Sequence, residues 1–489
     1  MTARRMATLA TSAALVLASG ALAAPAALGV AGHGPGSEPG HGQAKNVILL
    51  IGDGMGETHV DAGAIRYYGA GGKLAMEKLP VLGSVSTYAV ERGSSAPELV
   101  TDSASAATAW SSGVKTYNAA IGVDTNGAIV PTLMEQAKSA GLRTGNVSTA
   151  EITDATPAAM FSHATLRGCQ GPTYTVASCE TLNGQPYLPI AQQIARNNVA
   201  DVILGGGNAR FTPADQQIMV GNGYTVLGSL GTTVATTTEL AAVNGRDRKV
   251  IGLFNTGNLT VEVNRAKAFP TAAVQAEPSL PEMTTKAIDL LSQSKDAARH
   301  GFFLQVEGAQ IDKRSHANDA AQTLGEVKAF DDAVAAAVAF AKRDKNTLVV
   351  VTADHECAGF NIIAKGSFVN SEATVPPGNQ AGTSSTQTPA RAAATTLDPT
   401  RSTGPVNGTG SADPKNFAPA TFRTADDPAS VQDGSPEASL WLTYLSGNHT
   451  GADVPLFAFG PGSVRFVGEQ DNTDLYDSMA AAIALKVAH

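Results

Sequence analysis

Four side chains that can bind metal ions follow short apolar runs of the chain. They are Asp53 after residues 47–51, Glu307 after residues 302–306, and Asp354 with His355 after residues 348–352. Such runs, rich in β-branched residues, are typical of strands buried on both faces. Because ligands bind beyond the carboxyl ends of strands in an open parallel sheet, we expect these four side chains to converge at one edge. Any one of the acids alone could be a helix cap or turn former.

A second group of candidate metal ligands lies further along the chain. Asp312 and His316 are four residues apart, a spacing that puts both side chains on one face of a helix. A carboxylate and an imidazole form half of a common type of zinc site, although a surface ion pair would have the same spacing. His449 lies between Gly447 and Gly451. We interpret this segment as a flexible loop, in which a histidine is well placed to be a ligand.

Ser103 opens an alanine-rich stretch that we interpret as a helix. The amino end of a helix offers unpaired N–H groups and a positive dipole, which suit a phosphate group and a serine alkoxide. As an isolated feature, Ser103 would simply be a helix N-cap. The sequence has no Gly-x-Ser-x-Gly turn and no evident His–Asp relay near Ser103, so a protease or esterase triad is disfavoured. Activation of the serine by metal ions remains the open route.

The elements that must hold these residues form an alternating pattern of helices and strands. Residues 132–140 and 319–342 have helical apolar spacing and precede apolar runs at residues 142–147 and 348–352. Further apolar runs occur at residues 202–204 and 456–459. This alternation predicts an α/β fold with a central, mainly parallel sheet flanked by helices on both faces. A long insertion rich in Thr, Ser, Pro and Gly spans about residues 369–437, as a lid, an interface arm or a passive loop.

The composition limits the class of protein and its partners. The chain has 489 residues, 43% of them hydrophobic, which suffices for a large core and excludes disorder throughout. A net charge of -9 and the absence of a basic run argue against a nucleic-acid partner. We expect one catalytic domain over residues 45–489.

The amino-terminal residues predict export. Residues 1–31 contain Arg4, Arg5, an apolar stretch and small-residue cleavage sites, as in an export signal that is too weakly apolar for a permanent membrane span. Residues 32–44 would form a flexible mature amino terminus of a secreted or periplasmic protein. An oxidising compartment permits disulfides, for which Cys169 and Cys179 are the natural pair, with Cys357 left over.

Taken in order, the motifs resemble those of the secreted bacterial type of metal-dependent alkaline phosphatase. The resemblance covers most of the chain after the export signal. It rests on residues 51–56, 101–104, 113–116, 149–157, the segment around Arg167, and residues 306–308, 312–316, 352–355 and 449–451.

The resemblance implies a function and a role for each candidate residue. The chain would hydrolyse small phosphate monoesters at alkaline pH, using two zinc ions and one magnesium ion. Ser103 would be the nucleophile that forms a phosphoserine intermediate, and Arg167 would bind phosphate. The implied ligands are Asp312, His316 and His449 for one zinc ion, Asp53, Asp354 and His355 for the other, and Asp53, Thr156 and Glu307 for magnesium. The resemblance allows a homodimer, although no sequence feature identifies an interface.

Three further residues would support this site. Asp102 would orient Arg167, or would act only as a charge at the start of the helix. Asp154 and Lys313 would tune phosphate release and magnesium binding. The chain departs from the family where many relatives have Asp-His-Ala-His, because here Glu356 and Cys357 follow Asp354 and His355. The thiol is either merely buried or alters the choice of metal.

Two other functions fit parts of the pattern. A phosphodiesterase of the same superfamily would use similar ligands, and a noncatalytic, metal-stabilised binding protein would keep the fold without turnover. A sulfatase is disfavoured because neither Pro nor Arg follows Ser103 as its formylglycine motif requires.

Overall fold

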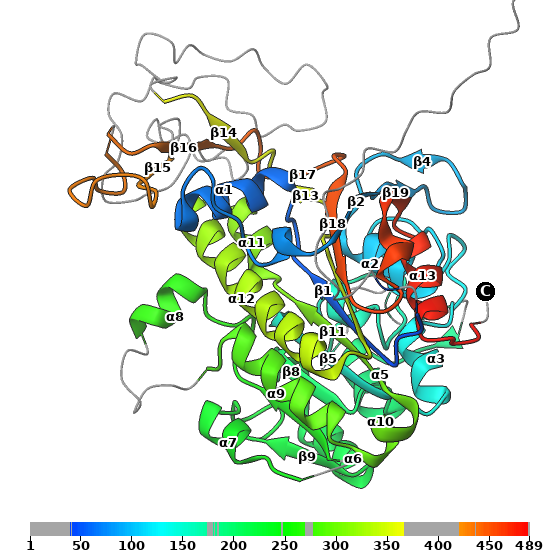
Figure 1. The fold of residues 1–489 in the computed structure, drawn as a ribbon. Helices are drawn as coiled ribbons and strands as arrows, with labels where there is room; N and C mark the ends of the chain where they lie inside the picture. Colours follow the sequence, from blue (N-terminus) through cyan, green and yellow to red (C-terminus); the bar gives the residue numbers. More distant parts are fainter. Residues whose placement is uncertain are drawn as a thin grey trace, which may run out of the picture. The chain divides into compact units, whose positions relative to one another are not determined.

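The computed structural model of the chain describes residues 40, 42–173, 179, 181–182, 185–245, 248–268, 277–365, 420–435 and 437–487 (Figure 1). The predicted export signal lies outside the described residues, as does the predicted mature amino terminus apart from residue 40 and residues 42–44. Residues 369–419 of the predicted insertion also lie outside them.

Ten strands form one large sheet. They are β1 (Asn46–Ile51), β2 (Val81–Ser86), β5 (Arg143–Glu151), β8 (Val202–Gly206), β9 (Tyr224–Leu227), β10 (Lys249–Leu253), β11 (Phe302–Glu307), β12 (Thr347–Thr352), β18 (Val454–Phe459) and β19 (Gly468–Asp471). Their order is β19-β2-β18-β12-β1-β11-β5-β8-β10-β9. Strand β18 runs antiparallel to both its neighbours, and the other neighbouring pairs are parallel. The predicted mainly parallel sheet is therefore confirmed.

Helices cover both faces of this sheet, as the sequence predicts. They are α1 (Glu57–Tyr68), α2 (Ser103–Ser112), α3 (Leu133–Ser139), α4 (Ala155–Ala158), α5 (Ile190–Asn197), α6 (Pro213–Gly221), α7 (Thr237–Ala242), α8 (Glu262–Ala268), α9 (Leu280–Ser292), α10 (Lys295–His300), α11 (Gln310–His316), α12 (Ala320–Asp344) and α13 (Asp474–Ala482). In Figure 1, α9 and α12 lie on one side of the sheet and α2, α3 and α13 on the other. Helices α3 and α12 match the two predicted from apolar spacing within two residues at each end.

Smaller sheets complete the described structure. They pair β3 (Ala89–Val90) with β4 (Pro97–Glu98), β6 (Thr181–Leu182) with β7 (Gln185–Pro186), β13 (Glu356–Cys357) with β17 (His449–Thr450), and β16 (Leu440–Thr443) with both β14 (Asn361–Ile363) and β15 (Ala420–Phe422). The sequence predicted no strand within residues 369–437, so β15 is a difference. Its three residues are too few to show a period, and it is stabilised by packing of Phe422 in a small core with Leu440 and Leu442.

Two of the three cysteines are joined in a disulfide. Cys169 and Cys179 form a disulfide, which confirms the predicted pair. Cys357 is free and buried. Among the described residues, no helix is both long and apolar enough to cross a bilayer.

The turn after β1 packs tightly against two other segments. Gly54 has a φ of +72°, in the left-handed region that favours glycine. A Cβ atom at this position would lie 2.8 Å from Cα of Asp312 and 2.9 Å from Cβ of Cys357. The turn, the start of α11 and strand β13 are therefore fixed close together by the absence of a side chain at Gly54.

We predict that Gly54→Ala destabilises the protein much more than Gly93→Ala. Gly93 has a similar φ of +70° but has nothing within 4 Å of an added Cβ, so its variant should lose only the cost of the left-handed conformation, about 1–2 kcal/mol. Gly54→Ala adds the overpacking cost, typically about 1–3 kcal/mol. Urea unfolding of both variants measures the difference. Equal losses of unfolding free energy in the two variants would show that the close packing at Gly54 does not contribute to stability.

Candidate active site

The register of three central strands brings the predicted acids together. Ile51 at the end of β1 pairs with Glu307 on one side and with Thr352 on the other. Asp53 and Asp354 each follow two residues after these paired positions. All three acids are buried at the carboxyl edge of β12, β1 and β11. The predicted convergence at one edge of the sheet is what the structure shows.

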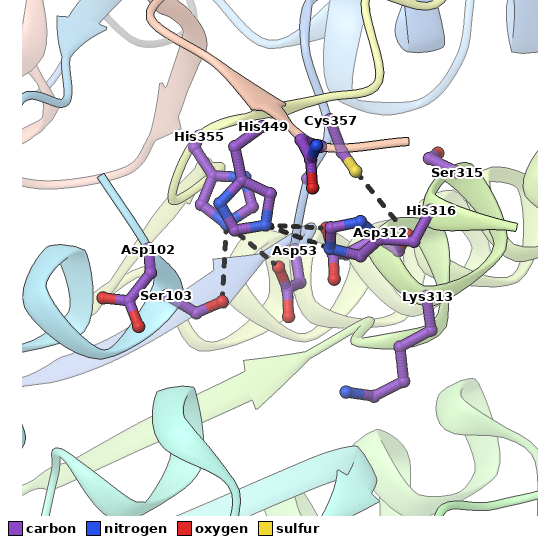
Figure 2. A network of polar contacts seen from close by, with 12 residues as sticks. Asp53, Asp102, Ser103, Asp312, Lys313, Ser315, His316, His355, Cys357 and His449 are labelled. Carbon is purple, nitrogen blue, oxygen red and sulfur yellow. Dashed lines mark hydrogen bonds and ion pairs between the residues drawn. The ribbon is translucent and has the colours of Figure 1, made fainter. Parts of the chain in front are cut away.

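The side chains of Asp312, His316 and His449 meet at the end of helix α11 (Figure 2). Oδ1 of Asp312 lies 3.3 Å from Nε2 of His316 and 3.5 Å from Nε2 of His449. The Nδ1 atoms point the other way, 2.7 Å from the carbonyl of Gly447 and 2.9 Å from that of Thr101. Because a carbonyl only accepts, each Nδ1 carries hydrogen and each Nε2 is left to bind a cation.

His449 is held more firmly than the sequence indicated. We expected a flexible loop, but His449 and Thr450 form β17, which pairs antiparallel with β13. A ladder of two residue pairs leaves no pattern in the sequence. Opposite His449 stands Cys357, whose Sγ lies with the ligand atoms of Asp312, His316 and His449 within 4.8 Å of one another. Burial, and then the charge of Asp312, raise the pKa of the Cys357 thiol.

Asp53, Asp354 and His355 form a second group beside the first. Nε2 of His355 lies 3.1 Å from Oδ2 of Asp354 and 3.8 Å from Oδ1 of Asp53. The His355 ring stacks on that of His449 with centroids 3.5 Å apart, as Figure 2 shows. The other carboxylate oxygen of Asp354 accepts hydrogen bonds from the backbone N–H groups of Gly54 and His355. Each of the two groups could hold a metal ion.

Several polar atoms of the predicted metal ligands are buried without a hydrogen-bond partner. They are Oδ1 of Asp53, Oδ1 of Asp312, Oδ2 of Asp354, Nδ1 of His355 and Oγ1 of Thr156. An unsatisfied buried polar atom costs about 1–3 kcal/mol. Bound cations would satisfy the four oxygen atoms in this set, so the residues fit the metal ions that the resemblance implies.

The acids differ in how their charges are balanced. Burial raises the pKa of Asp53 well above its usual range, and the charges of Asp354 and Asp312 raise it further. Burial also raises the pKa of Glu307 to about 7, although a hydrogen bond from Ser148 opposes this. Burial alone would raise the pKa of Asp312, but the close imidazoles of His316 and His449 hold it well below its usual range. Asp53 and Glu307 are therefore the acids whose charges are least well balanced.

Ser103 is the first residue of α2, and Asp102 is its N-cap, accepting from the N–H of Ser105 at 3.0 Å. The interpretation of Ser103 as an N-cap is therefore wrong. The hydroxyl of Ser103 is buried, 3.4 Å from Nε2 of His355. The nucleophile candidate thus lies between the positive end of a helix and the second group of ligands.

Arg167 connects the helix end to a network of charges. Its guanidinium donates to Asp102 and to Asp154, each at 3.1 Å, so Asp102 both caps α2 and contacts the arginine. Asp154 also accepts from Nζ of Lys313 at 2.8 Å. Burial alone would raise the pKa of Asp154, but the charges of Lys313 and Arg167 hold it well below its usual range. The structure therefore brings all three predicted supporting residues into one network.

Sequence reasoning missed two residues that contact the site. Ser148 donates to Glu307, and Glu356 accepts from Thr450 beside His449 at 2.5 Å. Ser148 lies within β5 and gave no signal, because a polar residue in a central strand shows its partner only in the folded sheet. Glu356 was noted only as a departure from the family pattern.

Comparison with known proteins agrees with this geometry. A family model for alkaline phosphatases matches residues 44–485. The alkaline phosphatase of Escherichia coli is 36% identical, with 91% of this chain and 87% of the relative covered. Streptomycin-6-phosphate phosphatase of Streptomyces griseus is also 36% identical, with 91% and 92% covered.

A solved structure with a similar fold is a variant of the alkaline phosphatase of the Antarctic bacterium TAB5 with magnesium bound. It has a TM-score of 0.62 and 28% identity, with 91% of this chain and 99% of that chain covered. Sequence and fold agree over nearly the whole described chain, and the acids and imidazoles above lie within the matched residues. The chain therefore belongs to the alkaline phosphatase family and is a phosphomonoester hydrolase.

Proposed function

We propose that this phosphatase works through a phosphoserine intermediate on Ser103, at a site that binds two zinc ions and one magnesium ion. The observation that carries the proposal is the position of the Ser103 hydroxyl. It is buried at the amino end of α2 and lies 3.4 Å from His355, whose ring stacks on His449. Ser103 thus lies beside the second group of candidate ligands, and the His355 ring of that group contacts His449 of the first.

The chemistry of the donor atoms supports the choice of metals. Each of the two groups combines imidazole nitrogen with carboxylate oxygen, which suits zinc. Asp53, Thr156 and Glu307 offer only oxygen, which suits magnesium, and the related TAB5 variant has magnesium bound. When bound, these cations would neutralise charge on the phosphate and lower the pKa of a neighbouring hydroxyl.

The residues of the chain then account for two chemical steps. Ser103 Oγ attacks phosphorus, and the bond from phosphorus to the ester oxygen breaks, so that the alcohol leaves. Water then attacks the phosphoserine, releasing inorganic phosphate and restoring the Ser103 hydroxyl. The N–H groups at the start of α2 favour the negative charge on phosphate throughout.

Arg167 is the residue that binds the phosphate oxygens. Its planar guanidinium can donate two parallel hydrogen bonds to two oxygen atoms, which the single ammonium of a lysine cannot do. Asp102 and Asp154 hold the guanidinium from behind, each at 3.1 Å. Its side chain remains 31% exposed, so it is accessible to a ligand.

We also propose a broad range of phosphate monoesters as substrates and export from the cytoplasm. Two relatives are equally similar to this chain at 36% identity, but one is named only an alkaline phosphatase and the other is named for a single substrate, streptomycin 6-phosphate. The likeness therefore supports phosphate monoesters as a class and no particular ester. The predicted signal over residues 1–31 supports export. The disulfide between Cys169 and Cys179 fits an oxidising compartment.

We predict that Ser103→Ala lowers kcat by roughly ten-thousandfold or more, as expected for loss of a nucleophile. Ser111→Ala is the matched control, because Ser111 is buried in the same helix and donates only to the carbonyl of Thr108. Turnover of an aryl phosphate monoester and trapping of labelled phosphate on the protein test the proposal together. Full activity of the Ser103 variant would rule out the nucleophile assignment.

We predict that Arg167→Lys raises KM and weakens inhibition by phosphate about tenfold or more, because one charge-assisted hydrogen bond is worth about 1.5–3 kcal/mol. Arg66→Lys is the control, since Arg66 forms a similar two-bond fork with Asp433, away from the acids and imidazoles of the site. Steady-state kinetics with phosphate as the inhibitor measures both. Equal effects of the two replacements would argue against phosphate binding by Arg167.

We predict that removal of metal ions abolishes activity and makes stability fall with rising pH. The pKa of Glu307 is raised from 4.5 to about 7, so the folded state holds its proton more tightly than the unfolded state. The stability from this proton is complete below pH 4.5 and is lost as pH rises to about 7.

Thermal unfolding at pH 5 and pH 8 tests this prediction on stripped and refilled protein, with metal content measured in parallel. The stripped form should lose more stability between these pH values than the refilled form, and Glu307→Gln should reduce that loss. A stripped protein with full activity would contradict metal dependence.

A further inference from the structure

We propose that Glu356 is a positioning residue that fixes His449 in the site through Thr450. The inference rests on the proposed function, because the position of His449 matters only if His449 binds metal. Glu356 lies directly between His355 and Cys357 in the chain and does not itself belong to either group of candidate ligands.

Both oxygen atoms of the Glu356 carboxylate are engaged. One accepts from the hydroxyl of Thr450 at 2.5 Å and from the N–H of Gly359 at 3.1 Å. The other accepts from the N–H of Phe360 at 3.0 Å. Glu356 is only 8% exposed, so these bonds form away from bulk water. The carboxylate thus joins the segment after β13 to the residue that follows His449.

The rest of the connection between these segments is made by the backbone. Strands β13 and β17 pair over only two positions, with Glu356 opposite Thr450 and Cys357 opposite His449. Ladders this short have little stability of their own. Beyond the ladder, the N–H of Ala358 donates to the carbonyl of Asn448 at 2.9 Å, and the N–H groups of Leu445 and Ser446 donate to the carbonyl of Ala358.

The hydrogen bond from the Thr450 side chain to Glu356 adds a further contact between the two strands, at the position next to His449. It therefore limits how far the imidazole can move from Asp312.

Strand β13 is in turn attached to the second group of ligands. The N–H of Cys357 donates to the carbonyl of Gly54 at 3.0 Å, next to Asp53. The Glu356 side chain is also packed in place, because a Cβ added at Gly56 would lie 2.3 Å from its Cγ. The carboxylate therefore has a fixed position, and through it the position of His449 is fixed relative to Asp53 and His355.

The test uses metal affinity, which a merely structural role need not change. We expect Glu356→Ala to weaken zinc binding by about 10- to 100-fold, as loss of a partner behind a metal ligand typically does. Thr450→Val keeps the side-chain shape, removes one hydrogen bond, and should shift affinity in the same direction. Thr450→Ser restores the hydroxyl and should recover most of the loss. Competition with a chromophoric chelator gives the affinities, and the visible spectrum of the cobalt-substituted protein reports on His449.

Two controls separate the possible results. Asp331→Ala removes another buried carboxylate that binds two backbone N–H groups, those of Ala75 and Met76, so it should lower stability without changing zinc affinity. His449→Ala should lower zinc affinity. Thr450→Val with wild-type affinity and cobalt spectrum would overturn the positioning role while His449 stays a ligand. Wild-type affinity of His449→Ala would overturn the ligand assignment, and with it this inference.

Discussion

The site depends on the balance of charge among five acids that the fold holds close together, four of them buried and Asp154 partly buried. Asp312 is balanced by two imidazoles, Asp354 by His355, and Asp154 by Lys313 and Arg167. The charges of Asp53 and Glu307 are less well balanced, and their pKa values are raised. Burying a poorly balanced carboxylate is costly, so bound cations would stabilise a site that keeps two of them in one place. Such cations would also satisfy the neighbouring oxygen atoms that lack hydrogen bonds.

The scaffold holds these acids close together by placing them on rigid elements. Glu307 ends β11, and Asp53 and Asp354 follow β1 and β12. The register of these three adjacent strands is fixed by hydrophobic burial on both faces. A shift of one residue in that register would move every side chain to the other face, so the positions of the acids are tied to the stability of the core. Ser103 depends instead on the start of a helix, capped by the same Asp102 that holds Arg167. Ser103, the proposed nucleophile, and Arg167 are therefore positioned by one carboxylate.

Much of this arrangement could be predicted from the sequence, because apolar runs and helical spacing are local signals. The central strands and helices α3 and α12 were predicted from such signals, and the disulfide was predicted from the positions of three cysteines in a chain expected to be exported. The structure confirms both. The roles of the ligands came from a resemblance and stay predictions. Strands β15 and β17 were missed because they are two or three residues long and depend on partners far away in the chain. The N-cap of α2 is Asp102, one residue before the serine that the sequence offered for that position. Aspartate and serine are about equally favoured at an N-cap, so the sequence could not decide between them.

Lys313 has a part in this balance that sequence position alone does not reveal. Its ammonium binds Asp154 at 2.8 Å, and its charge also lowers the pKa values of Asp53 and Glu307. It therefore supplies some of the positive charge that a magnesium ion would supply at the same acids. A fixed ammonium and a bound cation repel each other, so Lys313 would weaken the binding of such an ion while it stabilises the site without one. Asp154 also accepts from Arg167, so the same carboxylate links Lys313 to the guanidinium that we propose binds phosphate.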